Sequence, residues 1–296
     1  MIIVTGASGQ LGGATVERLL ERLPAEQVGV SVRDPEKVPE FAARGVRVRR
    51  GDFEDPASLV HAFEGASRVL IVSTATTGEV AVRHHRTAID AAKEAGAGRI
   101  LYTSHMGSNP ASPFAPMVDH AATEVALRDS GVPFTSLRNG FYAASGAMLL
   151  DNALRTGELA VPEDGPVSWT AHADLAEAAA LALTGGGEPD GSTGGELDGL
   201  TPALTGSEVI DMAGMAEIAS ELTGRTIRRT VVADEAYRAG LVAHGVPEPA
   251  ADLLLGIFVA SRQGEFAEVD PALARLLGRP PVPFREFLAT TVSPAR

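Results

Sequence analysis

The sequence predicts an α/β protein, with a doubly wound parallel sheet of the Rossmann type and a smaller, mostly helical cap. Strand-like apolar segments alternate with helix-like segments over residues 1–140, which is typical of a parallel sheet covered by helices on both faces. A glycine-rich turn follows the first strand directly. Residues 141–296 lack this alternation, so we expect a domain boundary near residue 140.

The expected elements of the first domain follow one another regularly. The strands are residues 1–5, 27–32, 46–50, 68–72, 99–103 and 134–137. The helices are residues 11–23, 35–43, a segment starting at Pro56, 82–95 and 118–130, with Asp34 and Asp55 as expected caps. This order predicts a doubly wound sheet with its first strand in a central position.

The second half predicts a helical cap with a few short strands. Helices are expected at residues 175–183, 215–222, 234–243 and 250–259, and strands at 195–197 and 226–231. Parts of residues 155–200 and 226–232 are expected to return to the main sheet, so that the cap and the first domain are interwoven.

Composition excludes several classes of function. The chain has 38 acidic and 25 basic residues and a formal net charge of −13, so we expect no direct contact with nucleic acid. The absence of cysteine excludes disulfides, thiolate metal sites and cysteine nucleophiles. No apolar run reaches the ~18 residues that span a bilayer, and residues 1–9 do not resemble a signal peptide. We therefore expect a cytoplasmic protein that does not contact membranes. We further expect a monomer or homodimer that acts on a small molecule.

The glycine turn TGASGQLG, Thr5–Gly12, is the first candidate site. Gly6 allows the tight turn, Gly9 lets the backbone approach a pyrophosphate, and Gly12 permits close packing of the helix. The helix start then offers N–H groups and a partial positive charge to phosphates. This pattern predicts a dinucleotide bound by Gly6, Ser8, Gly9, Gln10 and Leu11; the alternative is a structural turn without a ligand.

The end of the second strand indicates which dinucleotide is bound. NAD enzymes usually carry an acidic residue there, whereas this chain has Arg33, followed by Asp34 as a helix cap. A guanidinium suits a 2′-phosphate, so we expect NADP(H) to be preferred over NAD(H). Alternatively, Arg33 is an ordinary solvated arginine.

The ends of the next strands supply further cofactor candidates. Asp52 can accept a hydrogen bond from the adenine amino group while the N–H of Phe53 donates to a ring nitrogen; alternatively, Asp52 only forms a turn. Ligands of such sheets bind beyond the carboxyl ends of the strands. Four further residues are therefore expected beside the ribose and nicotinamide: Ser73, Thr74, Thr103 and Ser104.

Several motifs together resemble the NmrA-like atypical short-chain dehydrogenases/reductases, and within them the quinone oxidoreductases. These motifs are TGASGQLG, SVRDP, GDFEDP, the helical segment His120–Glu124, SGVPFTSLRNGFY and LGRPPVPFREF, and they extend over nearly the whole chain. The resemblance implies an NAD(P)H-dependent reductase of quinones or similar electron-poor molecules. It equally fits a non-catalytic NADP(H)-binding sensor, a role that some NmrA-like proteins have.

The acid of ordinary short-chain dehydrogenases is missing. These enzymes use a Tyr-x-x-x-Lys pair, and alignment through Gly131–Thr135 puts Pro116 at the tyrosine position and His120 at the lysine position. A quinone accepts hydride without a strong acid, because positioning and modest hydrogen bonding suffice. His120 is our candidate N–H donor or proton carrier; the alternative is a structural helix histidine. Arg33 and the missing tyrosine also argue against an NAD-dependent epimerase.

The segment after the sixth strand supplies the candidate acceptor site. Gly140 permits close approach of the backbone to the cofactor. Asn139, Phe141 and Tyr142 are expected to form the wall beside the nicotinamide, and Tyr142 is the second candidate catalytic residue. Alternatively, the two aromatic residues pack between the domains. No set of residues predicts a metal site.

Overall fold

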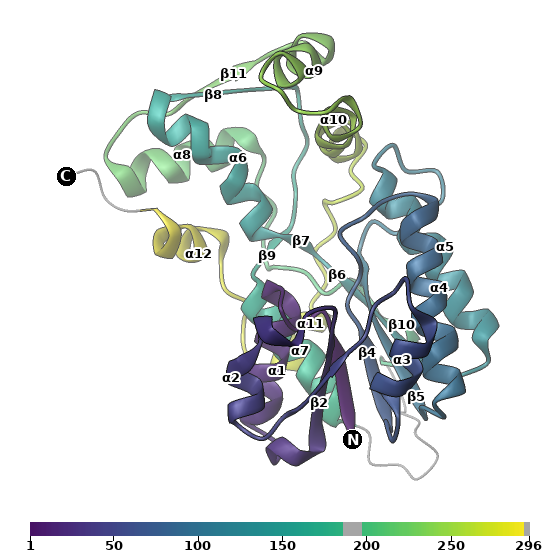
Figure 1. Cartoon of the computed structure of the whole chain (residues 1–296). Helices are drawn as coiled ribbons and strands as arrows, with labels where there is room; N and C mark the ends of the chain where they lie inside the picture. Colours follow the sequence, from purple (N-terminus) through teal and green to yellow (C-terminus); the bar gives the residue numbers. More distant parts are fainter. Residues whose placement is uncertain (186–196, 293–296) are drawn as a thin grey trace. The chain divides into compact units, whose positions relative to one another are not determined.

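The computed structural model describes residues 1–185 and 197–292, and the chain divides into two compact units (Figure 1). The first unit contains Met1–Pro110, Pro116–Asn139 and His172–Leu204. The second contains Ala111–Ala115, Gly140–Ala171 and Thr205–Arg296. The chain thus leaves the first unit after residue 139, close to the expected boundary, and returns to it at residue 172.

The first unit is built on a parallel sheet with the strand order β10-β6-β5-β4-β1-β2-β3. β1 lies between β2 and β4, in the interior position predicted for the first strand. β5 and β6 each run two residues further than predicted, which brings His105 and Asn139 into the sheet. The strands are β1 (Ile2–Thr5), β2 (Val28–Val32), β3 (Arg47–Arg50), β4 (Arg68–Ile71), β5 (Arg99–His105), β6 (Phe134–Asn139) and β10 (Gly199–Leu200).

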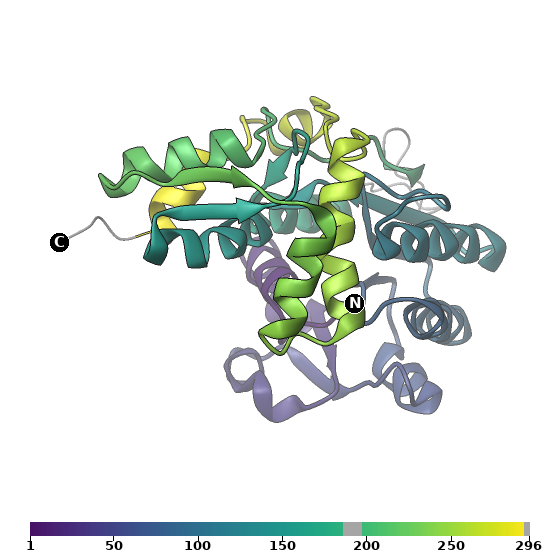
Figure 2. The same ribbon diagram turned by 90° about the horizontal axis from the view of Figure 1, so that it is seen from above.

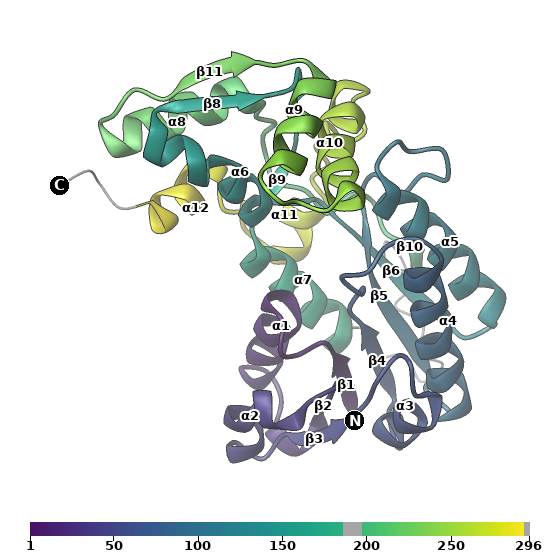
Figure 3. The same cartoon turned by 45° about the horizontal axis from the view of Figure 1, so that its top comes forward.

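Helices cover both faces of this sheet (Figure 3). α1 (Gln10–Leu20) packs against α7 (His172–Thr184) on one face, and α3 (Pro56–Phe63), α4 (Glu79–Glu94) and α5 (Ala115–Ser130) lie on the other. Asp55 caps α3 through its bond to the N–H of Ser58, as predicted. Apolar side chains of β1, β4 and β5 form the core between the sheet and α3 and α4.

The helix predicted at residues 35–43 is interrupted. A short 3-10 turn, η2 (Pro35–Lys37), precedes α2 (Pro39–Ala43), and a second such turn, η1 (Ala25–Gln27), precedes β2. Pro39 has no N–H and therefore breaks the helical hydrogen-bond ladder at this point.

The second unit combines helices with two small two-stranded sheets. Figure 2 shows β8 (Glu158–Val161, teal) beside β11 (Arg228–Val231, green), and β7 (Phe141–Tyr142) pairs with β9 (Trp169–Thr170). Its helices are α6 (Ala143–Thr156), α8 (Met212–Thr223), α9 (Asp234–Ala243), α10 (Glu248–Arg262), α11 (Ala272–Leu277) and α12 (Phe284–Thr291). Of these, α6, α11 and α12 have no counterpart among the predicted elements.

The expected return of residues 226–232 to the main sheet is wrong, because β11 pairs with β8 instead. Arg229 holds this pair together: its guanidinium donates to the carbonyl of Val161 and lies 3.0 Å from a carboxylate oxygen of Asp164. Of residues 155–200, α7 and β10 do belong to the first unit, whereas β8 does not. The strand predicted at 195–197 falls mostly outside the described residues, and the nearest strand is β10.

No helix in the described ranges is both long and apolar enough to cross a membrane.

Candidate functional site

The glycine turn between β1 and α1 has the geometry of a phosphate-binding loop. Gly6 has a φ of 63°, which glycine adopts without strain. A Cβ on Gly12 would lie 2.4 Å from the carbonyl oxygen of Gly6, so only glycine lets α1 approach the turn this closely. A Cβ on Gly9 would make only one ordinary contact, at 3.4 Å, so space remains above the backbone there.

The start of α1 is open to an anion. Among the described residues, no side chain caps its first turn, so these N–H groups remain available to a ligand. Ser8 and Gln10 are exposed beside the turn, whereas Leu11 is buried and contributes only its backbone to the surface. Thr5 fixes the base of the turn, because its hydroxyl accepts the N–H of Val72 at 2.9 Å.

Arg33 is an exposed cation directly after β2. Because β2 pairs with β1 up to Thr5, the end of β2 lies next to the glycine turn. Within the described residues Arg33 forms no ion pair, so its guanidinium is available for a phosphate. Asp34 accepts the N–H of Glu36 at 3.1 Å and caps the following turn, as predicted.

Asp52 is engaged locally. Its Oδ1 accepts the N–H of Glu54 at 3.1 Å, and its Oδ2 lies 3.5 Å from the Arg50 guanidinium. The turn-forming interpretation therefore accounts for this carboxylate, and its contact with adenine stays a prediction. Phe53 is half-buried, with its ring centroid 6.2 Å from that of His84.

Hydrogen bonds tie the ends of β4 and β5 together. The Thr103 hydroxyl is buried and accepts the N–H of Ser73 at 2.9 Å. Thr74 donates its own N–H to Nε2 of His85 at 3.0 Å. Thr103 thus has a structural role, while Ser73 and Thr74 remain half-buried at the carboxyl edge where a ribose is expected.

Three histidines and a tyrosine cluster beside the end of β5. Tyr102 is fully buried, and its hydroxyl lies 2.7 Å from Nδ1 of His120 in α5 and 3.4 Å from Nδ1 of His85 in α4. The His105 ring stacks on His120 with centroids 6.2 Å apart. The candidate catalytic residue His120 is therefore in contact with both Tyr102 and His105.

The hydrogen bonds of this cluster determine which ring nitrogens carry protons. Nε2 of His85 accepts a backbone N–H, so the neutral ring carries its proton on Nδ1 and donates it to Thr123 Oγ1 at 2.8 Å. Tyr102 therefore cannot donate to His85, and of the two nearby Nδ1 atoms only that of His120 can accept its O–H. The neutral His120 then carries its proton on Nε2, for which the described residues provide no acceptor.

Burial keeps these histidines uncharged. Desolvation lowers the pKa of His85 to about 3, helped by the neighbouring histidines. It also lowers the pKa of His120 to about 4, although the carboxylate of Glu124 opposes this shift. The pKa of the buried His105 lies well below its ordinary value for the same reason. At neutral pH, His120 is thus a hydrogen-bond donor rather than an imidazolium acid.

These lowered pKa values predict that acid destabilises the fold. Between pH 6.5 and about 4 the unfolded chain binds protons at His85 and the folded chain does not, so the free energy of unfolding falls as the pH falls. The expected slope is up to about 1.4 kcal/mol per pH unit for one histidine. Between pH 7.5 and pH 5.0, the free energy of unfolding measured with urea should fall less in His85→Gln than in wild type. The exposed control His61→Gln should behave like wild type, and equal losses in all three proteins would contradict the prediction.

Glu124 joins α5 to the ends of β5 and β6. It is only 4% exposed. Oε1 accepts hydrogen bonds from Ser104 at 2.8 Å, Ser136 at 3.1 Å and Arg138 at 3.0 Å. Oε2 accepts from Arg138 at 2.7 Å and Ser108 at 3.0 Å. Burial raises the pKa of Glu124, but these hydrogen bonds outweigh it and leave the pKa below its ordinary value. The hydroxyl of Ser104, a predicted cofactor contact, is therefore used inside the protein.

Asn139 ends β6 beside His105. Its side chain is 1% exposed, and within the described residues its Oδ1 has no hydrogen-bond partner. A buried unsatisfied polar atom costs roughly 1–3 kcal/mol, and a ligand that donates a hydrogen bond to Oδ1 would remove this cost. The role of Asn139 toward cofactor and acceptor stays a prediction.

The next three residues belong to the second unit. Phe141 is buried there, with ring centroids 5.4 Å from Trp169 and 4.9 Å from Phe266. The packing interpretation therefore accounts for the Phe141 ring. Tyr142 is half-buried and immediately precedes α6, and Gly140 links it to β6. Their roles toward cofactor and acceptor stay predictions.

Sequence reasoning did not find Tyr102 and Glu124 as parts of the site. The Tyr-x-x-x-Lys spacing joins two residues along one helix, whereas Tyr102 reaches His120 from a strand. One signal was present: a tyrosine within a fully buried parallel strand needs a partner for its hydroxyl. Among the described residues, no group of three or more possible metal ligands occurs.

The fold and the turn define a class of protein. A parallel sheet with the order 3-2-1-4-5-6 and a glycine turn at its carboxyl edge is typical of dinucleotide-binding proteins. A family model described as NAD(P)H-binding matches residues 6–184. The chain is also 32% identical to quinone oxidoreductase 2 of Escherichia coli K12, over 98% of both chains. The chain belongs to the NmrA-like, NAD(P)H-binding family of atypical short-chain dehydrogenases/reductases.

Further relatives agree with this assignment. An NmrA-like oxidoreductase of Aspergillus flavus is 30% identical over 96% of this chain and 92% of its own. The crystal structure of the E. coli NADPH-dependent quinone oxidoreductase with NADPH matches with a TM-score of 0.90 and 31% identity, over 98% of this chain and 99% of that one. The triphenylmethane reductase of Citrobacter sp. with NADP(H) matches with a TM-score of 0.88 and 31% identity, over 99% and 100%.

Proposed function

We propose that this protein uses NADPH, in preference to NADH, to reduce a quinone or a similarly electron-poor conjugated molecule. The observation that carries the proposal is the state of His120. It stands where ordinary short-chain dehydrogenases have the lysine of their dyad, Pro116 stands at the tyrosine position, and the His120 ring offers an N–H without carrying a charge. This arrangement suits an acceptor that needs a hydrogen bond rather than a strong acid.

The residues of the first unit fit the cofactor. The open start of α1 and the space above Gly9 suit a pyrophosphate, and the exposed guanidinium of Arg33 suits a 2′-phosphate. Oδ1 of Asn139, which has no partner among the described residues, suits a donor such as an amide. When bound, the reduced nicotinamide supplies a hydride. The similarity to the E. coli quinone oxidoreductase and the Citrobacter triphenylmethane reductase supports an extended conjugated acceptor.

The chain's own part in the reaction is positioning and hydrogen bonding. Hydride transfer to one quinone oxygen leaves the hydroquinone monoanion, and Nε2–H of His120 stabilises the negative charge on the other oxygen by donating a hydrogen bond. Water supplies the proton that completes the hydroquinone. Tyr102 holds the imidazole in the required tautomer through its bond to Nδ1.

Anaerobic NADPH oxidation in the presence of a simple benzoquinone tests the proposal. We expect saturable turnover with one hydroquinone formed per NADPH consumed. Tight NADPH binding without turnover over a panel of benzoquinones, naphthoquinones and triphenylmethane dyes would overturn it and would favour an NADP(H)-binding sensor.

The preference for NADPH should depend on Arg33. Replacing Arg33 by alanine is expected to weaken NADPH binding by roughly 1.5–3 kcal/mol and to leave NADH binding nearly unchanged, because a charge-assisted contact to the 2′-phosphate is lost. Titration of both cofactors by fluorescence measures this difference. Arg22→Ala, which removes another exposed arginine of the first unit, is the control. An equal loss for both cofactors in Arg33→Ala would show that Arg33 does not recognise the 2′-phosphate.

A further inference from the structure

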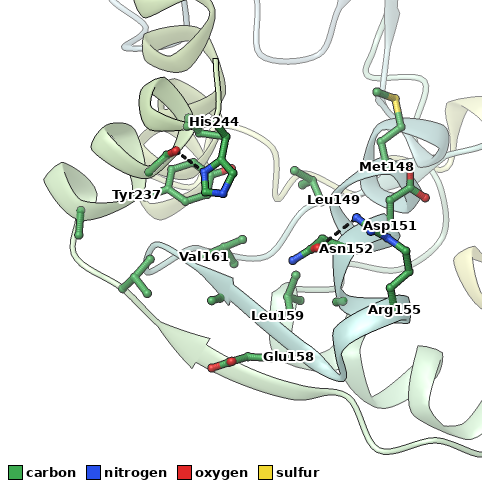
Figure 4. A pocket seen from close by; sticks show the side chains of 16 residues that line it. Met148, Leu149, Asp151, Asn152, Arg155, Glu158, Leu159, Val161, Tyr237 and His244 are labelled. Carbon is green, nitrogen blue, oxygen red and sulfur yellow. Dashed lines mark hydrogen bonds between the residues drawn. The ribbon is translucent and has the colours of Figure 1, made fainter. Parts of the chain in front are cut away.

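The second unit contains a cavity of its own (Figure 4). It has a volume of about 570 Å³ and lies between α6, β8 and α9, with the buried side chains of Leu159 and Val161 on its β8 side. This volume falls within the range of small-molecule pockets, roughly 300–1,000 Å³. None of the residues predicted for the cofactor or the acceptor lines it.

The walls of this cavity are mainly apolar and include one aromatic ring. α6 contributes Met148 and Leu149, and α9 contributes Leu241 and the half-buried Tyr237. The Tyr237 ring is held edge-on against Phe258, with centroids 5.3 Å apart. Met148 is 73% exposed at the rim, and a flexible thioether adapts readily to a flat ligand. The walls therefore suit a planar aromatic body.

The hydrogen bonds around the cavity fix which of its polar groups donate and which accept. Nδ1 of His244 lies 2.7 Å from the carbonyl oxygen of Gly240, which can only accept, so the neutral ring presents Nε2 as an acceptor. On α6, Arg155 donates to Oδ1 of Asn152 at 3.2 Å, which leaves the Asn152 amide nitrogen with two N–H donors. Within the described residues Arg155 has no carboxylate partner, and Figure 4 shows the Asp151 carboxylate pointing away from the cavity.

We propose that this cavity is a second binding site, for a planar aromatic molecule with a hydroxyl group at one end and a carboxylate or carbonyl at the other. The hydroxyl donates to Nε2 of His244. The carboxylate or carbonyl accepts from Asn152 and lies beside the positive charge of Arg155. The aromatic rings lie between α6 and α9. The site requires no cofactor and no reductase activity.

The probe for this site is 6-hydroxy-2-naphthoate, which carries both groups at opposite ends of a fluorescent ring system and accepts no hydride. Fluorescence titration of wild type should show saturable binding of one molecule per chain, unchanged by saturating NADPH. Gly240→Leu should fill the cavity and weaken this binding at least about tenfold, a loss of about 1.4 kcal/mol of binding free energy. Position 240 tolerates a side chain, because its φ is not positive and a Cβ there would meet nothing within 4 Å.

Ala239→Leu is the matched control, because it adds the same side chain to α9 at an exposed position outside the cavity lining. It should bind like wild type. His244→Phe and Asn152→Leu should each weaken binding roughly tenfold, the effect of one lost hydrogen bond. Absence of binding by wild type, or undiminished binding by Gly240→Leu, would overturn the site. Undiminished binding by both His244→Phe and Asn152→Leu would overturn the assigned ligand class. NADPH oxidation, measured separately, reports on the proposed reductase and not on this site.

Discussion

Replacing His120 by alanine should lower the turnover number for benzoquinone reduction roughly 10²–10³-fold, with NADPH affinity nearly unchanged. The reason is the loss of the only hydrogen-bond donor that we assign to the developing negative charge, an effect of about 3–4 kcal/mol on the barrier. Single-turnover oxidation of bound NADPH measures this step directly. A loss of less than threefold would show that His120 is the structural residue of the alternative interpretation.

Two tyrosine variants distinguish a tyrosine that donates a proton to the acceptor from one that positions the His120 ring. Tyr142→Phe should keep turnover within about tenfold, because no tyrosine acid is required. Tyr102→Phe should lower the turnover number while the KM for the acceptor changes little, because the hydroxyl that fixes the His120 tautomer is lost. A collapse of activity in Tyr142→Phe, with the fold and NADPH binding intact, would make Tyr142 the acid and return ketone reduction to consideration.

The pH profile adds an independent measurement. The pKa of His120 is lowered to about 4 by burial, so its ring stays neutral between pH 6 and 8 and turnover should be flat over this range. A rate that falls with a midpoint near pH 6.5 would show instead that the imidazolium is the active form.

The sequence predicted the first unit well, because its signals are local. Each strand of the parallel sheet is a short apolar run followed by a turn, and Gly6 and Gly12 occupy positions that the backbone geometry restricts to glycine. The ends of β5 and β6 were predicted two residues early, because His105 and Asn139 are polar residues that the sheet nevertheless buries. Polar residues at the carboxyl end of a strand therefore make the predicted strand too short.

The second unit and the cluster around His120 were less predictable, because both depend on contacts between residues distant in the sequence. β11 pairs with β8 across some 70 residues, and no local pattern distinguishes that pairing from a return to the main sheet. The bond between Tyr102 and His120 similarly joins a strand to a helix. Thr103 and Ser104 lie near the end of β5 but not at it, and only the structure shows which neighbours bond to their hydroxyl groups.

Loss of Glu124 should destabilise the first unit strongly. Glu124→Leu is expected to lower the free energy of unfolding by about 3 kcal/mol or more, because it removes the carboxylate from five hydrogen bonds and leaves the Arg138 charge without it. Urea unfolding at pH 7 measures this loss. The double variant Glu124→Leu/Arg138→Met should recover much of it, because it also removes the positive charge that the Glu124 carboxylate balances.

The effect of Glu124 should also depend on pH, in a direction that its pKa fixes. The pKa of Glu124 in the folded protein lies below its ordinary value, because the bonds from Arg138 and the serines outweigh burial. The carboxylate therefore contributes stability above about pH 4.5, and this contribution is lost as the pH falls through the folded pKa. The difference in stability between wild type and Glu124→Leu should shrink on acidification below pH 4.5. A difference below 1 kcal/mol at pH 7, or one that grows in acid, would contradict the assignment of Glu124 as the ionised link between α5 and the carboxyl edge of the sheet.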